Sequence, residues 1–401
     1  MRERAARWRF LLVTACYQGF TLSDGALRML VLLHLQASGR TPWALALVLL
    51  PYELAGVFTN LLGGWLGARF GLKLPLLLGM LLQGAACLLL AADAAWLTLP
   101  YVMATQVLSG IAKDLAKTAA KSYVRTLAPA TAGSGALFAM VAWLTGSKNV
   151  TKGLGFFVGG ALLALAGFRG TNFGLAVLLA ALALALAWLL PSQPGKPAKV
   201  RNVVDHGPPV RWLALARLWL FASRDAWFTI ALPVFLVGAL QWPSPQVGTF
   251  LSAWVIGYGL VQAATPRLLR PGSANVGARW TAWATASLLV PLAATAAALH
   301  FGVSPGPTLV VGLCAYGVLF AMTSSLHSWL VLAIADGDDV VERVGFYYAA
   351  NSAGRLCGTL LSGALFAAFT NGVDGLVACL AASAALVGLA ALCTVPVRAG
   401  R

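Results

Sequence analysis

Charged residues are scarce in this sequence, and acidic ones are scarcest. The 401 residues include 28 Lys and Arg but only 12 Asp and Glu, for a net charge of +16. Charged residues make up 10% of the chain and hydrophobic residues 60%, and the mean hydropathy is +0.82. A soluble domain carries about 25% charged residues. The composition therefore excludes a soluble globular protein and predicts a membrane protein.

Cysteine and histidine are also few. The six cysteines and four histidines are dispersed, with no CxxC pair. This spacing argues against a zinc, iron–sulfur or disulfide framework, so we expect no metal and no cofactor. The isolated histidines also form no cluster of His, Cys, Ser or carboxylates with the catalytic spacing near one interface that a membrane-embedded enzyme needs. No Walker loop is present, which argues against direct use of ATP. The sequence therefore predicts a protein that is not an enzyme.

Twelve segments are long and apolar enough to span a bilayer, which takes about 20 residues each. A polar, Pro-rich stretch at 191–211 divides them into an N-terminal bundle at 1–190 and a C-terminal bundle at 212–401. The expected fold is an all-α integral membrane protein with twelve transmembrane helices. The spans are predicted near residues 10–35, 43–67, 74–92, 97–126, 135–167, 171–190, 212–239, 246–268, 279–301, 306–335, 341–369 and 375–396.

Basic residues between the spans gather on the side of the two termini, whereas Arg40 and Arg169 fall on the other side. Because Lys and Arg are enriched in cytoplasmic loops, both termini are predicted to be cytoplasmic. We expect a multi-pass protein of the inner (plasma) membrane. The positive charge is explained by orientation and anion binding, so no nucleic-acid partner is expected.

The two halves of the chain resemble each other. Asp24 matches Asp225 at an offset of 201, and Lys152 matches Arg355 at an offset of 203. Two six-helix repeats are the plan of the major facilitator fold. The segment from Gly63 to Lys73, GGWLGARFGLK, resembles that superfamily's G-x-L-A-D-R-x-G-R-K loop. Alanine occupies the position of the motif's Asp, which puts the usual cytoplasmic latch in doubt.

Nine basic residues lie well inside the predicted spans, away from their ends. A charge in hydrocarbon costs roughly 2.5 kcal/mol or more on insertion scales, so such residues face a bundle interior, a water-filled cavity or an anionic partner. A positive interior predicts an anionic solute, bound near the midplane where secondary transporters bind substrate. The nine are Arg28, Lys113, Lys117, Lys121, Lys148, Lys152, Arg217, Arg224 and Arg355.

A set of cationic and polar residues at similar depth forms the predicted substrate site, and the buried carboxylates are candidates for proton coupling. Asp24 and Arg28, four residues apart, could also form a local ion pair, and Asp114 could pair with its neighbouring lysines. Adjacent Arg224 and Asp225 are expected to point about 100° apart and not to neutralise each other. The predicted substrate residues are Arg28, Lys113, Lys117, Lys148, Asn149, Lys152, Arg224, His327, Asn351 and Arg355, and the coupling candidates are Asp24, Glu53, Asp114 and Asp225.

Five segments resemble one branch of the superfamily, the organoarsenical efflux permeases of the ArsJ type. The lysine-bearing segments, QVLSGIAKDLAKTAAKSYVRTL from Gln106 to Leu127 and LTGSKNVTKGLGFFVGG from Leu144 to Gly160, are its specific part. The others are GFTLSDGALRMLV at 19–31, FASRDAWFTIALPVFL at 221–236 and VGFYYAANSAGRLCGTLLSGALF at 344–366.

The resemblance implies export of 1-arseno-3-phosphoglycerate, conferring arsenate resistance, in functional pairing with the glyceraldehyde-3-phosphate dehydrogenase that makes this ester. The cargo would be a small anionic phosphorylated molecule, carried across the lipid bilayer by a monomer. Arginines in spans one and seven also resemble those of organophosphate–phosphate antiporters, so an organophosphate/phosphate exchanger is an alternative. A multidrug–proton antiporter is less well matched, because such proteins usually have acidic, aromatic cavities.

Overall fold

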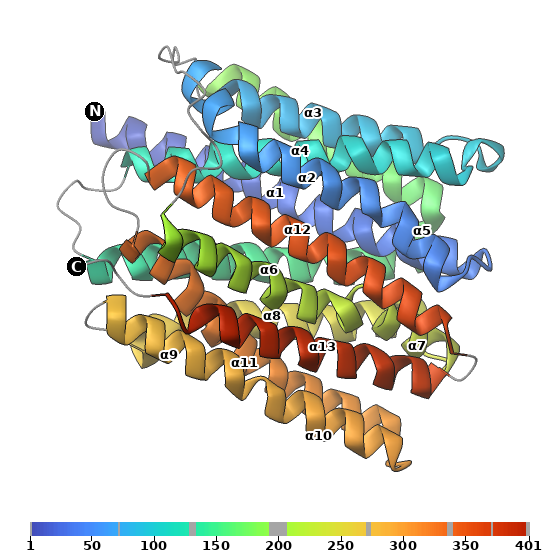
Figure 1. Cartoon of the computed structure of the whole chain (residues 1–401). Helices are drawn as coiled ribbons and strands as arrows, with labels where there is room; N and C mark the ends of the chain where they lie inside the picture. The colour runs from blue at the N-terminus through green and yellow to red at the C-terminus, as the bar shows by residue number, and fades with distance from the viewer. Residues whose placement is uncertain are drawn as a thin grey trace.

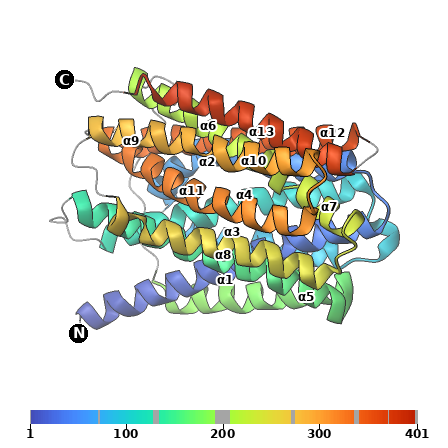
Figure 2. The same ribbon diagram turned by 90° about the horizontal axis from the view of Figure 1, so that it is seen from below.

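The computed structural model describes residues 2–70, 73–127, 134–191, 207–269, 274–334, 340–369 and 372–397. These residues form thirteen α-helices and one short 3-10 helix, η1. The helices run roughly along one common direction (Figures 1 and 2). Both termini lie at one end of the bundle, which we call the terminal end, and α7 and α10 lie at the opposite end (Figure 1).

The first half of the chain contributes five helices. The fifth, α5, holds two of the predicted spans, because Gly167 has a φ of 68° and the chain turns there. Such a positive φ is favourable for glycine, which has no Cβ. The elements are α1 (Arg2–Ala37), α2 (Pro42–Phe70), α3 (Lys73–Leu90), η1 (Ala94–Trp96), α4 (Leu99–Leu127) and α5 (Ser134–Leu189).

The second half contributes eight helices, because two predicted spans are each split by a proline. Pro233 cannot donate a hydrogen bond to Thr229, and α6 ends at Phe228; Pro291 cannot donate to Ser287, where α9 ends. The helices are α6 (Pro208–Phe228), α7 (Ala231–Gly238), α8 (Ser244–Leu268), α9 (Ala274–Ser287), α10 (Leu289–His300), α11 (Pro305–Ile334), α12 (Val340–Ala367) and α13 (Gly372–Thr394).

Every predicted span therefore coincides with a helix or a pair of helices. By length and composition, eight segments of the described chain qualify as membrane spans, with the two arms of α5 counted as one. The predicted spans that fail this test are α1, α4 and α12. Each of these three carries charged side chains of the cavity described below. The charges that mark a functional site thus also weaken the hydropathy signal.

The bundle is apolar outside as well as inside. Large side chains such as Leu165, Trp188 and Trp283 are 82%, 86% and 76% exposed. Such a surface is unfavourable in water and suits contact with lipid. Inside, one apolar core is built mainly from residues before 191, and a second mainly from residues after 219. The second core also takes in Met29 and Leu33 of α1, so the halves are in contact.

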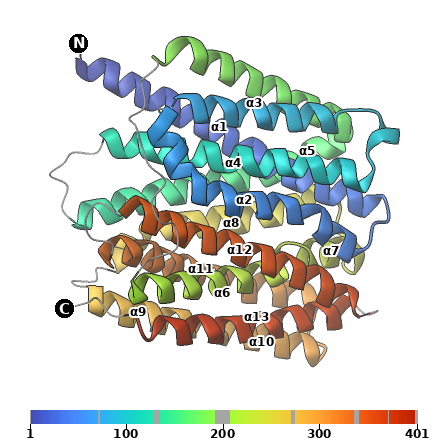
Figure 3. The ribbon, with the colours of Figure 1, turned by 45° about the horizontal axis from the view of Figure 1, so that its top comes forward.

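The internal repeat is visible in how the halves pack. Gly160 of α5 lies against Gly248 of α8, and Gly363 of α12 lies against Ala46 of α2. The two α5 and α12 glycines differ by 203 positions, and their partners differ by 202. Side chains at these glycines would collide with the neighbouring helix, so they permit close helix approach. Figure 3 shows α12 beside α2.

Two features of the sequence lie wholly or mostly outside the described residues. The polar stretch at 191–211 is described only at its ends, so the division into bundles at 1–190 and 212–401 stays a prediction. Side chains of the latch-like loop from Gly63 also fall outside, except for Lys73, whose Nζ donates to the carbonyl of Ala187 at 2.7 Å. The side chain of Lys121, one of the nine basic residues predicted inside the spans, is outside too.

Candidate functional site

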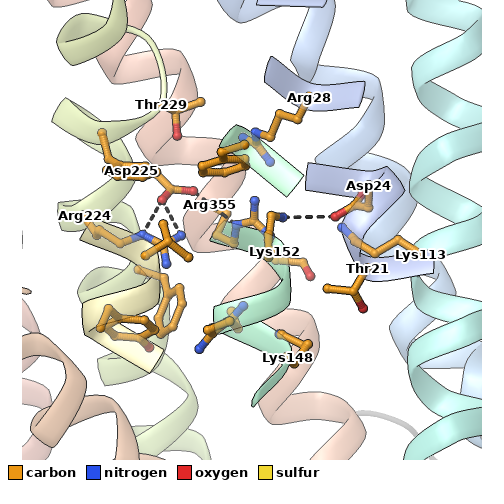
Figure 4. Close-up of a pocket in the computed structure, with 18 of the residues that line it drawn as sticks. Thr21, Asp24, Arg28, Lys113, Lys148, Lys152, Arg224, Asp225, Thr229 and Arg355 are labelled. Carbon is orange, nitrogen blue, oxygen red and sulfur yellow. Dashed lines mark hydrogen bonds and ion pairs between the residues drawn. The ribbon is translucent and has the colours of Figure 1, made fainter. Parts of the chain in front are cut away.

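A cavity lies between the two halves of the bundle. It is lined by α1, α4 and α5 from the first half and by α6, α7, α8, α11 and α12 from the second. The cavity volume is about 170 Å³, and the cavity is partly open to solvent. Charged side chains from the two halves project into it and face one another (Figure 4).

Glu53 of α2 is the centre of an ion-pair cluster behind the cavity wall. Its Oε1 lies 2.9 Å from Nη1 of Arg28 and 2.6 Å from Nη2 of Arg355. Lys113 Nζ lies 3.9 Å from the other oxygen. Glu53 is fully buried, so these cations compensate a carboxylate that is removed from water. Arg355 comes from the second half, and its bond to Glu53 therefore joins the halves.

Two ion pairs in the cavity are related by the internal repeat. Lys152 Nζ of α5 lies 3.1 Å from Asp24 of α1, and Arg355 Nε of α12 lies 3.1 Å from Asp225 of α6 (Figure 4). Asp24 also accepts a hydrogen bond from the Tyr52 hydroxyl at 2.5 Å. The sequence left open a pair between Asp24 and Arg28. The structure instead joins each of them to another helix.

Arg224 and Asp225 do contact each other, contrary to the prediction. Arg224 Nε donates to Asp225 Oδ1 at 2.7 Å, and its Nη2 lies 2.5 Å from the same oxygen. The long arginine side chain folds back across the 100° between adjacent positions. Its Cζ lies 4.8 Å from the ring centre of Phe221 and 5.6 Å from that of Phe320. Arg224 still lines the cavity, as expected.

The lysines of α4 hold Asp114. Lys117 Nζ forms an ion pair with Asp114, and Lys113 Nζ lies 3.6 Å from its second oxygen. Lys113 also lies 4.0 Å from the ring centre of Tyr52. This agrees with the alternative in which Asp114 pairs with its neighbouring lysines. Both lysines nevertheless line the cavity.

A layer of hydrogen-bonded polar side chains lies beside this charged cluster. Asn149 Nδ2 donates to Gln262 Oε1 at 2.7 Å, and Gln262 in turn donates to Ser324 Oγ at 3.4 Å. Arg217 donates to Ser324 Oγ at 3.1 Å and, through Nε, to Asn351 Oδ1 at 3.0 Å. The layer links α5, α8, α11, α6 and α12, and hence both halves.

The fold and this cavity can be compared with known proteins. A model described as Major Facilitator Superfamily matches residues 10–239, which is more than half of the chain. The chain belongs to the major facilitator superfamily. It is therefore a multi-pass membrane protein of a transporter family, and its function is transport rather than enzymatic catalysis. None of the curated proteins matches.

Solved structures of superfamily transporters share the fold at low sequence identity. A bacterial homologue of the iron transporter ferroportin, in an outward-facing state, superposes with a TM-score of 0.67 at 17% identity, covering 96% of this chain and 98% of its own. The human organic anion transporter MFSD10 (TETRAN) gives 0.69 at 16%, covering 96% and 98%. The proton:xylose symporter XylE gives 0.68 at 13%, covering 98% and 95%.

Within this superfamily fold, one predicted substrate residue lies away from the cavity. His327 is completely buried, and its Nε2 lies 3.4 Å from Thr285 Oγ1 of α9. Its helix neighbours Ser324 and Ser328 line the cavity instead. Adjacent positions on a helix point about 100° apart, so His327 faces α9 when Ser328 faces inward. The structure therefore does not bring His327 to the cavity with the other predicted substrate residues.

The remaining predicted substrate residues all line the cavity: Arg28, Lys113, Lys117, Lys148, Asn149, Lys152, Arg224, Asn351 and Arg355. The structure adds Arg217, which the sequence marked as a buried cation but did not assign to the site. The spacing of Arg217 could have assigned it to the site. Arg217 lies seven residues, or about two helical turns, before Arg224, so the two side chains share one face of the helix. Tyr52, which supports both Asp24 and Lys113, carried no signal in its sequence context.

Cationic side chains outnumber carboxylates in the cavity of this transporter. Eight basic side chains line it, whereas three acidic ones do and Glu53 lies just behind. The formal charge of the described site is therefore +4. Within the described parts of the chain, no group of three or more His, Cys, Asp or Glu residues is placed to hold a metal ion. The arrangement is suited to binding an anion.

Proposed function

We propose that this transporter exports a phosphorylated organic anion that carries pentavalent arsenic, 1-arseno-3-phosphoglycerate, by alternating access. The excess of four positive charges in the cavity carries the proposal that the cargo is an anion. Arginine's planar fork matches phosphate and arsenate oxygens. The arsenic-containing cargo is supported by the resemblance of the α4 and α5 segments to ArsJ-type permeases.

The absence of a thiolate cluster fits this chemistry. Trivalent arsenic prefers soft sulfur ligands. The six free cysteines are dispersed, and none is among the side chains that line the cavity. Arsenic in this cavity would therefore be bound as an oxyanion that resembles phosphate. Hard, charge-assisted hydrogen bonds from Lys and Arg supply such binding.

Ion-pair exchange provides a route from binding to movement. Each cavity carboxylate already pairs with a cation, for example Asp24 with Lys152. An incoming anion competes for these cations and so weakens the existing pairs. A further pair just behind the cavity wall, Glu53 with Arg355, joins the two halves. Substrate binding would thus loosen a contact between the bodies that must rock, and a released carboxylate could take up a proton.

The same site chemistry favours one alternative, an organophosphate/phosphate exchanger. Phosphate groups alone would satisfy the excess charge and the arginines. The two proposals differ in whether arsenic is needed in the cargo. A multidrug–proton antiporter is a poorer fit, since a cationic drug would be repelled by the cavity.

The test is arsenate resistance and arsenic efflux in sensitive cells that express this chain, with and without an arsenate-using glyceraldehyde-3-phosphate dehydrogenase. We expect resistance and efflux only when both proteins are present. No effect in cells where the protein reaches the inner membrane would reject the arsenical cargo. Phosphate-ester counterflow would then test the exchanger. Placing tags at both ends tests the proposed cytoplasmic termini.

A further inference from the structure

Arg217 differs from the other arginines of the cavity in what it contacts. It is 4% exposed and lines the cavity. Arg28, Arg224 and Arg355 each lie within 2.9 Å of a carboxylate oxygen. Arg217 instead donates to Asn351 Oδ1, to Ser324 Oγ and to the Ser324 carbonyl, all uncharged. Among the described residues, no acidic side chain forms an ion pair with it.

A buried cation without a counter-charge is costly. The effective penalty for removing an ion from water is several kcal/mol. The rings of Phe221 and Tyr347 lie 4.1 and 5.2 Å from the Arg217 guanidinium carbon. Cation–π contacts offset only part of this penalty. The balance favours an anion from outside the protein as the missing partner.

Arg217 lies at a different level of the cavity from the central cluster. It precedes Arg224 by seven residues on α6, which places it about 10 Å nearer the terminal end on the same helix face. Its partner Asn351 likewise precedes Arg355 by one turn on α12. The ring of Phe221 contacts both guanidinium groups: its centre lies 4.1 Å from Arg217 Cζ and 4.8 Å from Arg224 Cζ. Their separation cannot exceed the sum of these distances.

The neutral layer around Arg217 holds the guanidinium in place. Nε and Nη1 are used by Asn351 and Ser324. The second terminal nitrogen, Nη2, forms no hydrogen bond within the described chain. Ser324 is itself fixed by Gln262, which is fixed by Asn149. A donor held by uncharged groups at a cavity wall is preorganised for a ligand.

We propose that Arg217 binds a second anionic group of the substrate, so that the cargo has an anionic group at each of two ends. One end binds at the central cluster of Arg28, Lys152, Arg224 and Arg355, and the other binds at Arg217. This rests on the proposal above that the cargo is an organic anion. A three-carbon acid with a phosphate at the opposite end has an anionic group for the central cluster and another for Arg217. A phosphate ester of an alcohol has an anionic group for only one of these two positions.

Two ligands that differ in a single group test this directly. 3-Phosphoglycerate and glycerol 3-phosphate share the phosphate and the three-carbon chain, but the first ends in a carboxylate and the second in an alcohol. Binding is measured by the thermal shift of purified protein during titration. We expect wild type to bind 3-phosphoglycerate about tenfold more tightly, as one charge-assisted hydrogen bond allows.

The variants then assign that preference to Arg217. Arg217→Gln should remove the tenfold preference and leave glycerol 3-phosphate affinity within about twofold, and Arg217→Lys should restore part of the preference because it keeps the charge. Arg169→Gln, at an exposed position outside the cavity, is the matched control. Equal weakening of both ligands in Arg217→Gln, or no preference in wild type, would overturn the proposal. Should Arg217→Gln fail to fold, Arg217→Lys decides. A reduced preference with glycerol 3-phosphate affinity kept within about twofold would support the two-ended site. A preference lost together with glycerol 3-phosphate binding would show that Arg217 is structural and would contradict the two-ended site.

This outcome is separable from that of the arsenic assay, since neither ligand contains arsenic. A preference that depends on Arg217, together with no arsenic efflux, would retain the two-ended anion site and reject the arsenical cargo. Arsenic efflux that Arg217→Gln leaves unchanged would retain the cargo and reject the role of Arg217.

Discussion

Arg355 Nη2 lies 2.6 Å from Glu53 Oε1, and this contact joins the second half of the transporter to the first at the level of the cavity. The same guanidinium contacts Asp225 of its own half through Nε, at 3.1 Å. One side chain therefore connects the intra-half and inter-half ion pairs. Any anion that competes for Arg355 acts on both.

Glu53→Gln should abolish transport and lower the stability of the purified protein. The change leaves Arg28 and Arg355 without their shared carboxylate, and breaking a buried pair costs about 3–5 kcal/mol. Thermal unfolding and transport, each normalised to the amount of folded protein, are the measurements. Asp374→Asn, at an exposed site on α13, is the control and should leave both unchanged. Wild-type transport by Glu53→Gln would show that the inter-half pair is dispensable.

Replacing Lys152 alone and replacing Lys152 together with Asp24 should have different effects on protein stability. Lys152→Met alone leaves a buried carboxylate that, among the described residues, keeps a hydrogen bond from Tyr52 alone, and the expected loss is about 3 kcal/mol. The double variant Lys152→Met/Asp24→Asn removes both charges, so most of the stability should return. Transport should not return, because the substrate still lacks Lys152. A double variant that transports normally would make this pair purely structural.

Close packing between α1 and α5 should depend on Gly155. A Cβ there would collide with the backbone carbonyl of Leu22 and lie 3.1 Å from Gly25 Cα. Gly155→Val should therefore reduce the amount of folded protein recovered from membranes several-fold. Gly174→Val is the control on α5, where a Cβ meets nothing within 4 Å. Equal recovery of the two variants would contradict this packing.

His327 should be dispensable for substrate binding. It faces Thr285 rather than the cavity, although its position in the sequence suggested a binding role. His327→Gln should keep wild-type transport per folded molecule, with at most a change in thermal stability. Ser324→Leu, which places an apolar side chain at the cavity wall beside Arg217, should reduce transport. Loss of transport in a stable His327→Gln protein would place the histidine on the substrate path.

Much of the fold was predictable because bilayer thickness sets the length of each spanning segment and requires it to be mostly apolar. Twelve apolar segments and the match of Asp24 with Asp225 were sufficient for twelve spans in two repeats. The breaks near Thr229 and Ser287 follow from Pro233 and Pro291, but a proline does not always split a helix: Pro51 lies inside an unbroken α2.

The site was predictable in its location more than in its pairings. A buried charge signals a cavity because of its cost, so the depth of Lys113, Lys152 and Arg355 located the cavity. Which carboxylate each cation contacts depends on helix rotation and side-chain reach, and neither is a local property. Arg28 therefore pairs with Glu53 and not with Asp24, four residues away, and His327 faces away from the cavity.

The most direct test of the cationic cavity as an arsenoester site uses everted membrane vesicles containing the transporter. Purified dehydrogenase generates 1-arseno-3-phosphoglycerate outside the vesicles from glyceraldehyde 3-phosphate, arsenate and NAD+ as the oxidant. We expect arsenic to accumulate inside wild-type vesicles only while the dehydrogenase is active. Vesicles with equal amounts of Arg28→Met or Lys113→Met should accumulate none. Arsenic accumulation from arsenate alone would contradict the arsenoester cargo. Wild-type accumulation in the vesicles with Arg28→Met and in those with Lys113→Met would contradict the cationic cavity as its binding site.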